Sequence, residues 1–249
     1  MAKTANLVQL SSDTEQAFKA YTRTAEAEMD EALQGKGPFL WSDTSSTLSR
    51  QVRKGEIPSQ VWSGRGPRRV PKGLIHDWIG ALFIPGVSLQ ETLALVQNYN
   101  QHKVIYQPEV LESSLVSQRG NHFKIYLRLL KKKIVTVVLD TDHDVRYFPL
   151  DNSRCYCRSH TTRIAEVEKA GGPDEAVLPP DTGHGFLWRL DSHWKFQEKK
   201  NGTSVECRGI SLTRDIPFGL GWLIEPIIQN LPRESLIHTL EATRRALQR

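Results

Sequence analysis

The end of the chain carries its longest helical pattern, and this pattern constrains the fold more than any other feature. Apolar residues recur at helical spacing between Gly219 and Arg249, with charged residues on the opposite side. A helix of this length reaches roughly 45 Å, the full width of a domain of this size. Pro226 and Pro232 each lack a backbone donor, so we expect a bent helix, or a short helix followed by a long one.

The segment before this helix has the pattern of a β-hairpin. Aromatic and charged residues alternate from Phe186 to Phe196, which indicates a strand with one buried face. Asn201-Gly202 suits the positive φ angles of a tight turn, and Val205–Arg214 returns as the partner strand. The aromatic side of this hairpin needs a cover, and we expect the terminal helix to provide it.

Most of the remaining chain is predicted to form strands. Leu74–Ile84 is apolar on both faces, which indicates a buried strand. Capping boxes that begin at Ser12 and Ser88 predict two further helices, a long one and a short one. Short edge strands are expected near Val52 and Val61. The other expected strands span about residues 109–117, 122–130, 134–147 and 154–168.

The composition fits one large domain with an N-terminal appendage. The chain has 249 residues, of which 39% are hydrophobic, and a net charge of +5. We expect residues 65–249 to form the domain, and residues 1–64 to decorate its core with a helix and short strands.

No stretch of the sequence has the pattern of a membrane span or of a signal peptide. We therefore expect a cytoplasmic monomer, or a periplasmic or secreted one if a leader has been removed.

The three cysteines do not form a disulfide framework. Cys155 and Cys157 lie two residues apart on an expected strand, where they share a face and are poorly placed to bond each other. We expect buried thiols, although a bridge from either one to Cys207 stays open. No second Cys or His pair has zinc-ligand spacing, so no zinc site is expected.

The acidic motif Asp140-Thr-Asp142-His-Asp144 has the spacing with which a calcium loop begins. Val145 stands where such a loop needs Gly, and Asp151 stands where it needs Glu. We therefore interpret the motif as the acidic end of a strand and expect no metal site there.

A run of antiparallel strands closed by one long helix argues against a parallel α/β fold. The stretches LIHDWIGALFIPGVSLQETLALVQNY, SHTTRIAEVE, GFLWRLDSHWKFQE and VECRGISLTRDIPFGLGWLIEPII, at 74–99, 159–168, 185–198 and 205–228, carry a resemblance that covers about residues 70–249. The chain resembles the START-like (SRPBCC) helix-grip superfamily, which includes polyketide cyclases, coenzyme-Q-binding proteins, lipid-transfer proteins and birch-pollen-type allergens. This resemblance implies an α+β fold in which a curved antiparallel sheet wraps around the C-terminal helix and leaves an apolar hollow.

The resemblance implies a small hydrophobic ligand in that hollow, such as a lipid, an isoprenoid or a quinone. The expected apolar contacts are Trp78, Tyr126, Phe186, Trp188, Trp194, Leu220, Leu223 and Ile227. The expected polar anchors are His143, Arg158, Arg163, Glu206 and Arg214. We expect no catalytic residue and no cofactor, and the loop Gly171–Gly183 is long enough to act as a lid.

Two other functions remain open at this point. A cyclase- or aromatase-like enzyme would need His143 or His160 to face the hollow together with a carboxylate partner. A protein-interaction module would instead have a filled interior. The basic turns at Arg65–Lys72 and Lys131–Lys133 lack interleaved aromatic residues, so we expect no nucleic-acid binding and at most transient contact with an anionic membrane surface.

Overall fold

The computed structural model describes residues 7–132, 136–215 and 221–248, and the side chains of the last helix from Asn230 on. Its strands are β1 (Val8–Gln9), β2 (Ser59–Val61), β3 (Arg68–Val70), β4 (Gly73–Pro85), β5 (Val110–Arg119), β6 (His122–Lys132), β7 (Thr136–Pro149), β8 (Arg154–Glu168), β9 (Ala176–Val177), β10 (Thr182–Gly183), β11 (Arg189–Lys199) and β12 (Gly202–Arg214). Its helices are α1 (Ser12–Leu33), α2 (Ser46–Arg53), α3 (Leu89–Val96), α4 (His102–Ile105) and α5 (Gly221–Leu247), with 3-10 turns η1 (Trp41–Thr44) and η2 (Tyr99–Gln101).

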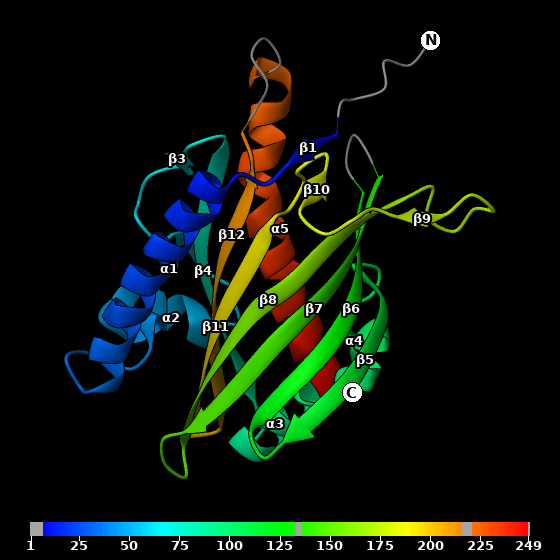
Figure 1. The fold of residues 1–249 in the computed structure, drawn as a ribbon. Coiled ribbons are helices and arrows are strands. Elements are labelled where there is room, and N and C mark those ends of the chain that lie inside the picture. Colours follow the sequence, from blue (N-terminus) through cyan, green and yellow to red (C-terminus); the bar gives the residue numbers. More distant parts are fainter. Residues whose placement is uncertain (1–6, 133–135, 216–220, 249) are drawn as a thin grey trace.

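The described strands form one large antiparallel sheet and a small ribbon. The large sheet has the order β2-β4-β12-β11-β8-β7-β6-β5, with β3 also paired to β4 and β9 to β8, while β1 pairs with β10. Figure 1 shows α5 running behind this sheet, and α1 on the side nearer the viewer. The molecule is therefore the expected α+β helix-grip fold, an antiparallel sheet covered by a long C-terminal helix.

The β11–β12 hairpin forms as predicted, with one difference at its start. Lys199 pairs with Gly202, and Asn201 and Gly202 have φ angles of 71° and 154°, which the tight turn requires. The first strand begins at Arg189 rather than at Phe186. The aromatic alternation therefore does not extend over the whole predicted stretch, and this changes the position of two expected pocket residues.

The predicted helix signals hold in part. Ser88 accepts from the backbone N–H of Glu91, and the Glu91 side chain accepts from the backbone N–H of Ser88, so this capping box is confirmed. The N-cap of α1 is Ser11 and not Ser12, because the Ser11 side chain accepts from the backbone of Thr14. Val52 lies on helix α2 rather than on an edge strand. Helix α5 continues through both prolines as one element.

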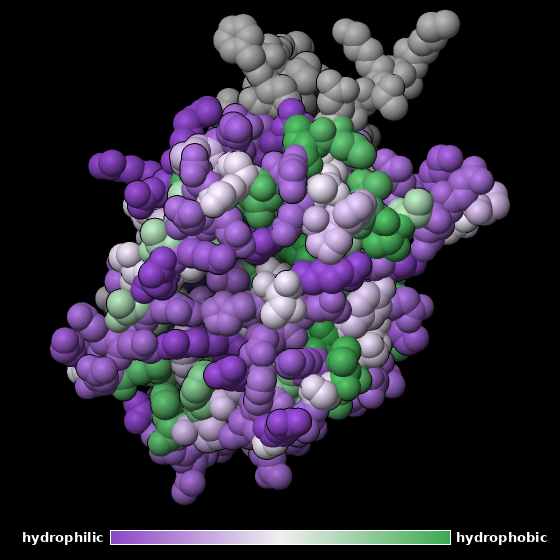
Figure 2. Space-filling view, in the orientation of Figure 1, coloured by the Kyte–Doolittle hydropathy of each residue, from purple (hydrophilic) through white to green (hydrophobic). Residues whose placement is uncertain are grey.

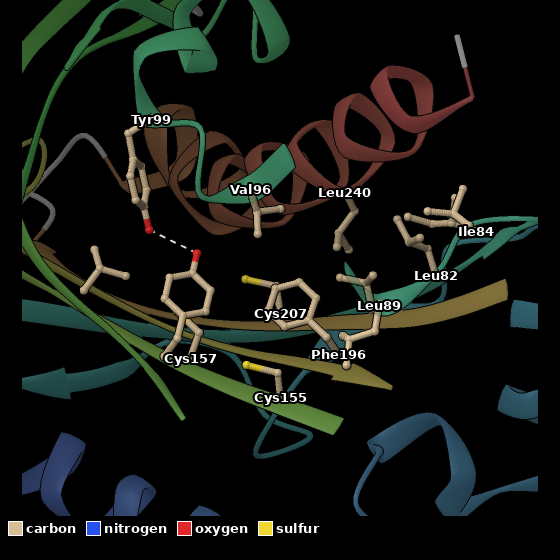
Figure 3. Close-up of a cluster of buried hydrophobic side chains, with 14 of the residues drawn as sticks. Leu82, Ile84, Leu89, Val96, Tyr99, Cys155, Cys157, Phe196, Cys207 and Leu240 are labelled. Atoms are coloured by element: carbon tan, nitrogen blue, oxygen red, sulfur yellow. Dashed lines mark hydrogen bonds between the residues drawn. The ribbon is translucent and has the colours of Figure 1, made fainter. Parts of the chain in front are cut away.

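The side of the sheet that faces α5 carries the larger hydrophobic core, and we call it the inner face. Figure 3 shows Leu240 of α5 and Tyr99 on the helical side of this core, above Cys157, Phe196 and other sheet residues. The hydroxyls of Tyr99 and Tyr147 are 3.0 Å apart and form a buried hydrogen bond. This part of the interior is filled with side chains.

The opposite side, which we call the outer face, is covered by the N-terminal segment. Phe18, Ala25 and Met29 of α1 pack on a second cluster of sheet residues that includes Ile75 and Tyr156. The surface seen in Figure 2, which views the molecule from this side, is mostly hydrophilic. Residues 1–64 were expected as decoration of the core, and their described part covers charged sheet residues as well as apolar ones.

The three cysteines are free thiols in the buried core. Burial raises the pKa of the Cys155 thiol to about 11 and that of the Cys207 thiol further. The bridge that the sequence left open is thus not formed, and the thiols act as small apolar side chains.

Candidate functional site

A row of small residues crosses the centre of the inner face. The register pairs Ser159 of β8 with Ser192 of β11, and Ser192 with Gly209 of β12. Trp78 of β4 lies next to Gly209 at one end, and Val145 of β7 lies next to Ser159 at the other. We call Gly209, Ser192 and Ser159 the small-residue row. Side chains this short leave space above the sheet where bulky neighbours flank them.

Several positions on or beside the small-residue row are only half-buried, although Ser159 and Val145 at its far end are buried. The half-buried residues are Trp78, Ser192, Trp194 and Gly209, and also Leu127 at the far side. A Cβ built on Gly209 would meet no described heavy atom within 4 Å. We infer a hollow between the inner face and α5 at this level, because a filled interior would bury these positions.

At Gly80, two residues beyond Trp78 on β4, an added Cβ would have no free space. A Cβ there would lie 3.0 Å from Leu240 and 3.3 Å from Leu236, both on α5. Helix α5 thus packs tightly on β4 at Gly80. The inferred hollow therefore does not extend over Gly80.

His143 is the polar group next to the small-residue row. Its Nε2 lies 2.9 Å from Thr141 Oγ1, and that hydroxyl donates to the carbonyl of Leu127. Nε2 must then carry the proton, which leaves Nδ1 as the acceptor of the ring. Burial, with a smaller contribution from His102, lowers the pKa of His143 to about 4, so the ring is neutral at pH 7.

His76 has the same arrangement on β4. Its Nε2 lies 3.1 Å from Thr213 Oγ1, which donates to the carbonyl of Arg214. Burial lowers the pKa of His76 to about 4. The inner face thus carries two neutral imidazoles whose described partners are threonine hydroxyls and not carboxylates.

The expected apolar contacts are divided between several places. Trp78 and Trp194 lie on the inner face beside the small-residue row. Trp188 precedes β11 and joins the α1 cluster on the outer face, and Phe186 is exposed and stacks on His184. Tyr126 points to the outer face, where its hydroxyl donates to Asp140. Leu220 lies outside the described residues, as do the side chains of Leu223 and Ile227 on α5.

Of the expected polar anchors, the structure places only His143 on the inner face. Arg158 forms an ion pair with Asp30 of α1, and Arg163 pairs with Asp142. Both arginines lie on the outer face, so we leave them out of the proposed site. Arg214 ends β12 and donates its backbone N–H to the carbonyl of Gly185.

Glu206 also lies on the outer face, beneath the N-terminal segment. Its carboxylate accepts from the backbone N–H groups of Trp41 and Ser42 at 2.8 and 2.7 Å. Burial raises the pKa of Glu206, and these two donors offset part of that effect. The prediction that Glu206 anchors a ligand in the hollow does not fit this position.

The sequence did not reveal a buried ion pair next to Glu206. Arg208 donates two hydrogen bonds to Asp77, at 2.9 and 2.6 Å, and lies 4.2 Å above the ring of Trp62. Tyr21 of α1 donates to the same carboxylate. Arg208 and Asp77 are charged residues on predicted strands, and no local signal showed that a distant helix would bury them.

The loop between β8 and β11, expected as a lid, is tied to the sheet in its second half. The Glu166 carboxylate accepts from the backbone N–H groups of His184 and Gly185 at 2.7 and 2.9 Å, and from Phe186. His184 Nδ1 lies 2.8 Å from the same carboxylate. This contact fixes the segment that leads into β11.

The acidic motif on β7 is engaged by neighbouring basic side chains. Arg128 pairs with Asp140, Arg163 with Asp142, and His122 lies 2.7 Å from Asp144. Within the described residues, no group of three or more His, Cys, Asp or Glu side chains is arranged to hold a metal ion.

Two surface grooves lie apart from the small-residue row. One, of about 260 Å³, is bounded by Leu95 and Val104 on one side and by Ala242 and Arg245 of α5 on the other. The second, of about 370 Å³, lies between α2, the β2 region and Arg233. Both are open and neither contains a residue of the small-residue row, so we do not assign the ligand to them.

None of the helices in the described part of the chain combines the length and hydropathy that a membrane span requires.

Comparison with known proteins gives similarity in fold alone. No protein-family model matches the chain, and no curated protein matches it. Solved structures that are similar include a STAR-related lipid transfer protein from Xanthomonas axonopodis (16% identity, 74% of this chain and 100% of that chain, TM-score 0.48). Human STARD10 is similar at 10% identity over 85% of this chain and 83% of that chain, with a TM-score of 0.45.

The Zhui aromatase/cyclase from Streptomyces sp. R1128 is similar at 8% identity over 70% of this chain and 94% of that chain, with a TM-score of 0.46. These structures are of the kinds that the sequence resembles.

Proposed function

We propose that this protein binds or carries a small hydrophobic ligand in the hollow between the inner face and α5. The observation that carries the proposal is the partial exposure of Ser192 and Gly209 in the small-residue row, with no described heavy atom within 4 Å of the Cβ position of Gly209. Water over Trp78 and Trp194 would contact large aromatic surfaces. Release of that water on ligand entry favours binding of an apolar molecule.

A cyclase-like reaction is less well supported. It would need an acid–base pair in the hollow, and the described partner of His143 is a threonine hydroxyl. His160 does have carboxylate neighbours, with Asp191 at 3.2 Å and Glu26 at 3.4 Å, but it lies on the outer face. The positions of both histidines therefore favour binding without catalysis.

Filling the hollow tests the proposal. Gly209→Phe adds a ring at a position where a Cβ meets no described heavy atom within 4 Å, so we expect stability within about 1 kcal/mol of the wild type and loss of ligand binding. Gly66→Phe is the matched control, because Gly66 is exposed in the loop between β2 and β3 and its Cβ position also has no described heavy atom within 4 Å.

Native mass spectrometry of freshly purified protein, followed by titration with a fluorescent apolar probe, gives the readout. We expect a bound apolar mass or a titratable site in the wild type and in Gly66→Phe, and neither in Gly209→Phe. Equal probe binding by all three proteins would reject the hollow as the site. A large loss of stability in Gly209→Phe would instead indicate a filled interior and favour the protein-interaction module.

We propose in addition that the protein acts as a monomer and touches anionic membrane surfaces only transiently, as expected for a carrier with modest positive charge.

A further inference from the structure

The inner face around the hollow is uncharged over three neighbouring rungs of the sheet. The rungs are defined by the strand register, in which residues of neighbouring strands lie side by side. Their inner-facing members lie between β6 and β4, and those used below are His143, Ser159, Ser192, Trp194, Gly209 and Trp78. These residues are apolar, hydroxyl-bearing or imidazole groups.

Charged side chains at the margins of this face are already engaged. Lys131, near the end of β6, forms an ion pair with Glu109. Glu166, near the end of β8, accepts from several backbone N–H groups and faces His184. Neither group is free to neutralise a charge on a ligand. The described inner face therefore offers hydrogen bonds and apolar contact, but no spare ion-pair partner.

Two hydroxyls of the small-residue row are suited to meet a ligand oxygen. Ser192 Oγ accepts from the Trp194 indole N–H at 3.3 Å, so its own proton remains available for donation. Ser159 is its direct neighbour in the register. The unprotonated Nδ1 of His143 adds a ring acceptor on the next rung.

We infer that the ligand is an uncharged apolar molecule with a hydroxyl or carbonyl oxygen, and that Ser159 and Ser192 recognise this oxygen. The inference rests on the proposed function and narrows its ligand class. An ionised carboxylate or phosphate would lose its hydration in the hollow and find no cation among the described inner-face side chains there. Such an unpaired charge is costly to bury, whereas a hydroxyl needs only the hydrogen bonds that serines supply.

A set of three ten-carbon probes tests the ligand class: decan-1-ol, decanoate and decane. Each is titrated at pH 7.5 by displacement of a fluorescent apolar probe from the full chain. We expect decan-1-ol to bind at least tenfold more tightly than decanoate, which is ionised at this pH. We also expect it to bind more tightly than decane, because decane cannot use the serine hydroxyls.

The double variant Ser159→Ala/Ser192→Ala tests the recognition. It is expected to weaken decan-1-ol binding about fivefold or more and to leave decane binding unchanged. Ser204→Ala is the matched control, because Ser204 is a buried serine on the outer face of β12. It should leave both affinities as in the wild type.

Three outcomes would overturn the inference. Decanoate binding as tightly as decan-1-ol would contradict the uncharged ligand while leaving the proposed function intact. Unchanged decan-1-ol affinity in the double serine variant would contradict recognition by this row. Failure of the wild type to bind any of the three probes would count against the proposed function itself, and the ligand class would be rejected with it.

Discussion

The buried polar residues of this protein belong to two groups with different roles. On the outer face, Asp77, Arg208 and Glu206 are almost fully buried and are paired with each other or with the N-terminal segment. On the inner face, His143 and His76 are buried without charge. Removal of one member of a buried ion pair typically costs about 3–5 kcal/mol, so we assign the outer group to stability.

His143 gives a prediction about pH. Its pKa is lowered to about 4 in the folded protein from about 6.5 in the unfolded chain, so the unfolded state binds the proton more readily. The contribution of neutral His143 to the free energy of unfolding is therefore fully present above pH 6.5, and it is lost as the pH falls toward 4. The free energy of unfolding should fall in both proteins between pH 7 and 4.5. We expect this fall to be about 2–3 kcal/mol smaller in His143→Gln than in the wild type.

Urea denaturation at the two pH values measures this difference. Thr141→Val is the control, because it removes the hydrogen-bond partner of His143 and keeps the ring that titrates. It should lose stability at both pH values and retain the wild-type pH dependence. An unchanged pH dependence in His143→Gln would show that other groups account for it.

For single residues, the sequence predicted which side chains share one face of a strand, but it did not predict which face is exposed to solvent. The alternation correctly placed Trp194 and Phe196 on one side of β11. It did not show that Glu206 would be covered by Trp41 and Ser42, which lie more than 160 positions earlier in the chain. The local sequence of a strand predicts that its charged residues are solvated or bind a ligand, because it carries no sign of a distant segment that buries them.

Among the elements, those with strong local signals matched the structure best. Strand β8 has the expected bounds, Arg154–Glu168, and the capping box at Ser88 begins α3. The polar composition of the stretch that contains Val52, together with its β-branched residue, predicts an edge strand. The stretch forms α2 instead, since Ser45 caps the helix by accepting from the backbone N–H of Thr47.

The segment around β10 gives a prediction at the element scale. Glu166 is its main polar attachment to the sheet, through backbone N–H groups of His184, Gly185 and Phe186. Replacement by Ala leaves these donors without their acceptor. We therefore expect Glu166→Ala to speed amide exchange at residues 182–187 by tenfold or more.

Hydrogen–deuterium exchange detected by mass spectrometry measures this effect, with peptides from α1 as the internal reference. Glu175→Ala is the matched control, because Glu175 lies in the same loop but accepts from Gly171 and Arg128. It should leave exchange at residues 182–187 unchanged. Equal exchange in the wild type and Glu166→Ala would show that the β1–β10 pairing alone holds the segment.

At the scale of the whole molecule, the sheet separates two chemistries. Its outer face buries ion pairs and polar groups under the N-terminal segment, while its inner face presents neutral side chains to the space below α5. The expected fold was confirmed, but most expected polar anchors proved to lie on the outer face.

Tryptophan quenching tests the hollow most directly, because Trp78 and Trp194 border it while Trp62 and Trp188 pack on the outer face. The account predicts that 10-bromodecan-1-ol quenches the fluorescence of the wild type and of Trp62→Phe/Trp188→Phe strongly. It predicts that Trp78→Phe/Trp194→Phe loses most of this quenching. The contradicting result is strong quenching of Trp78→Phe/Trp194→Phe, equal to that of the wild type, together with little quenching of Trp62→Phe/Trp188→Phe. That result would place the ligand away from the inner face.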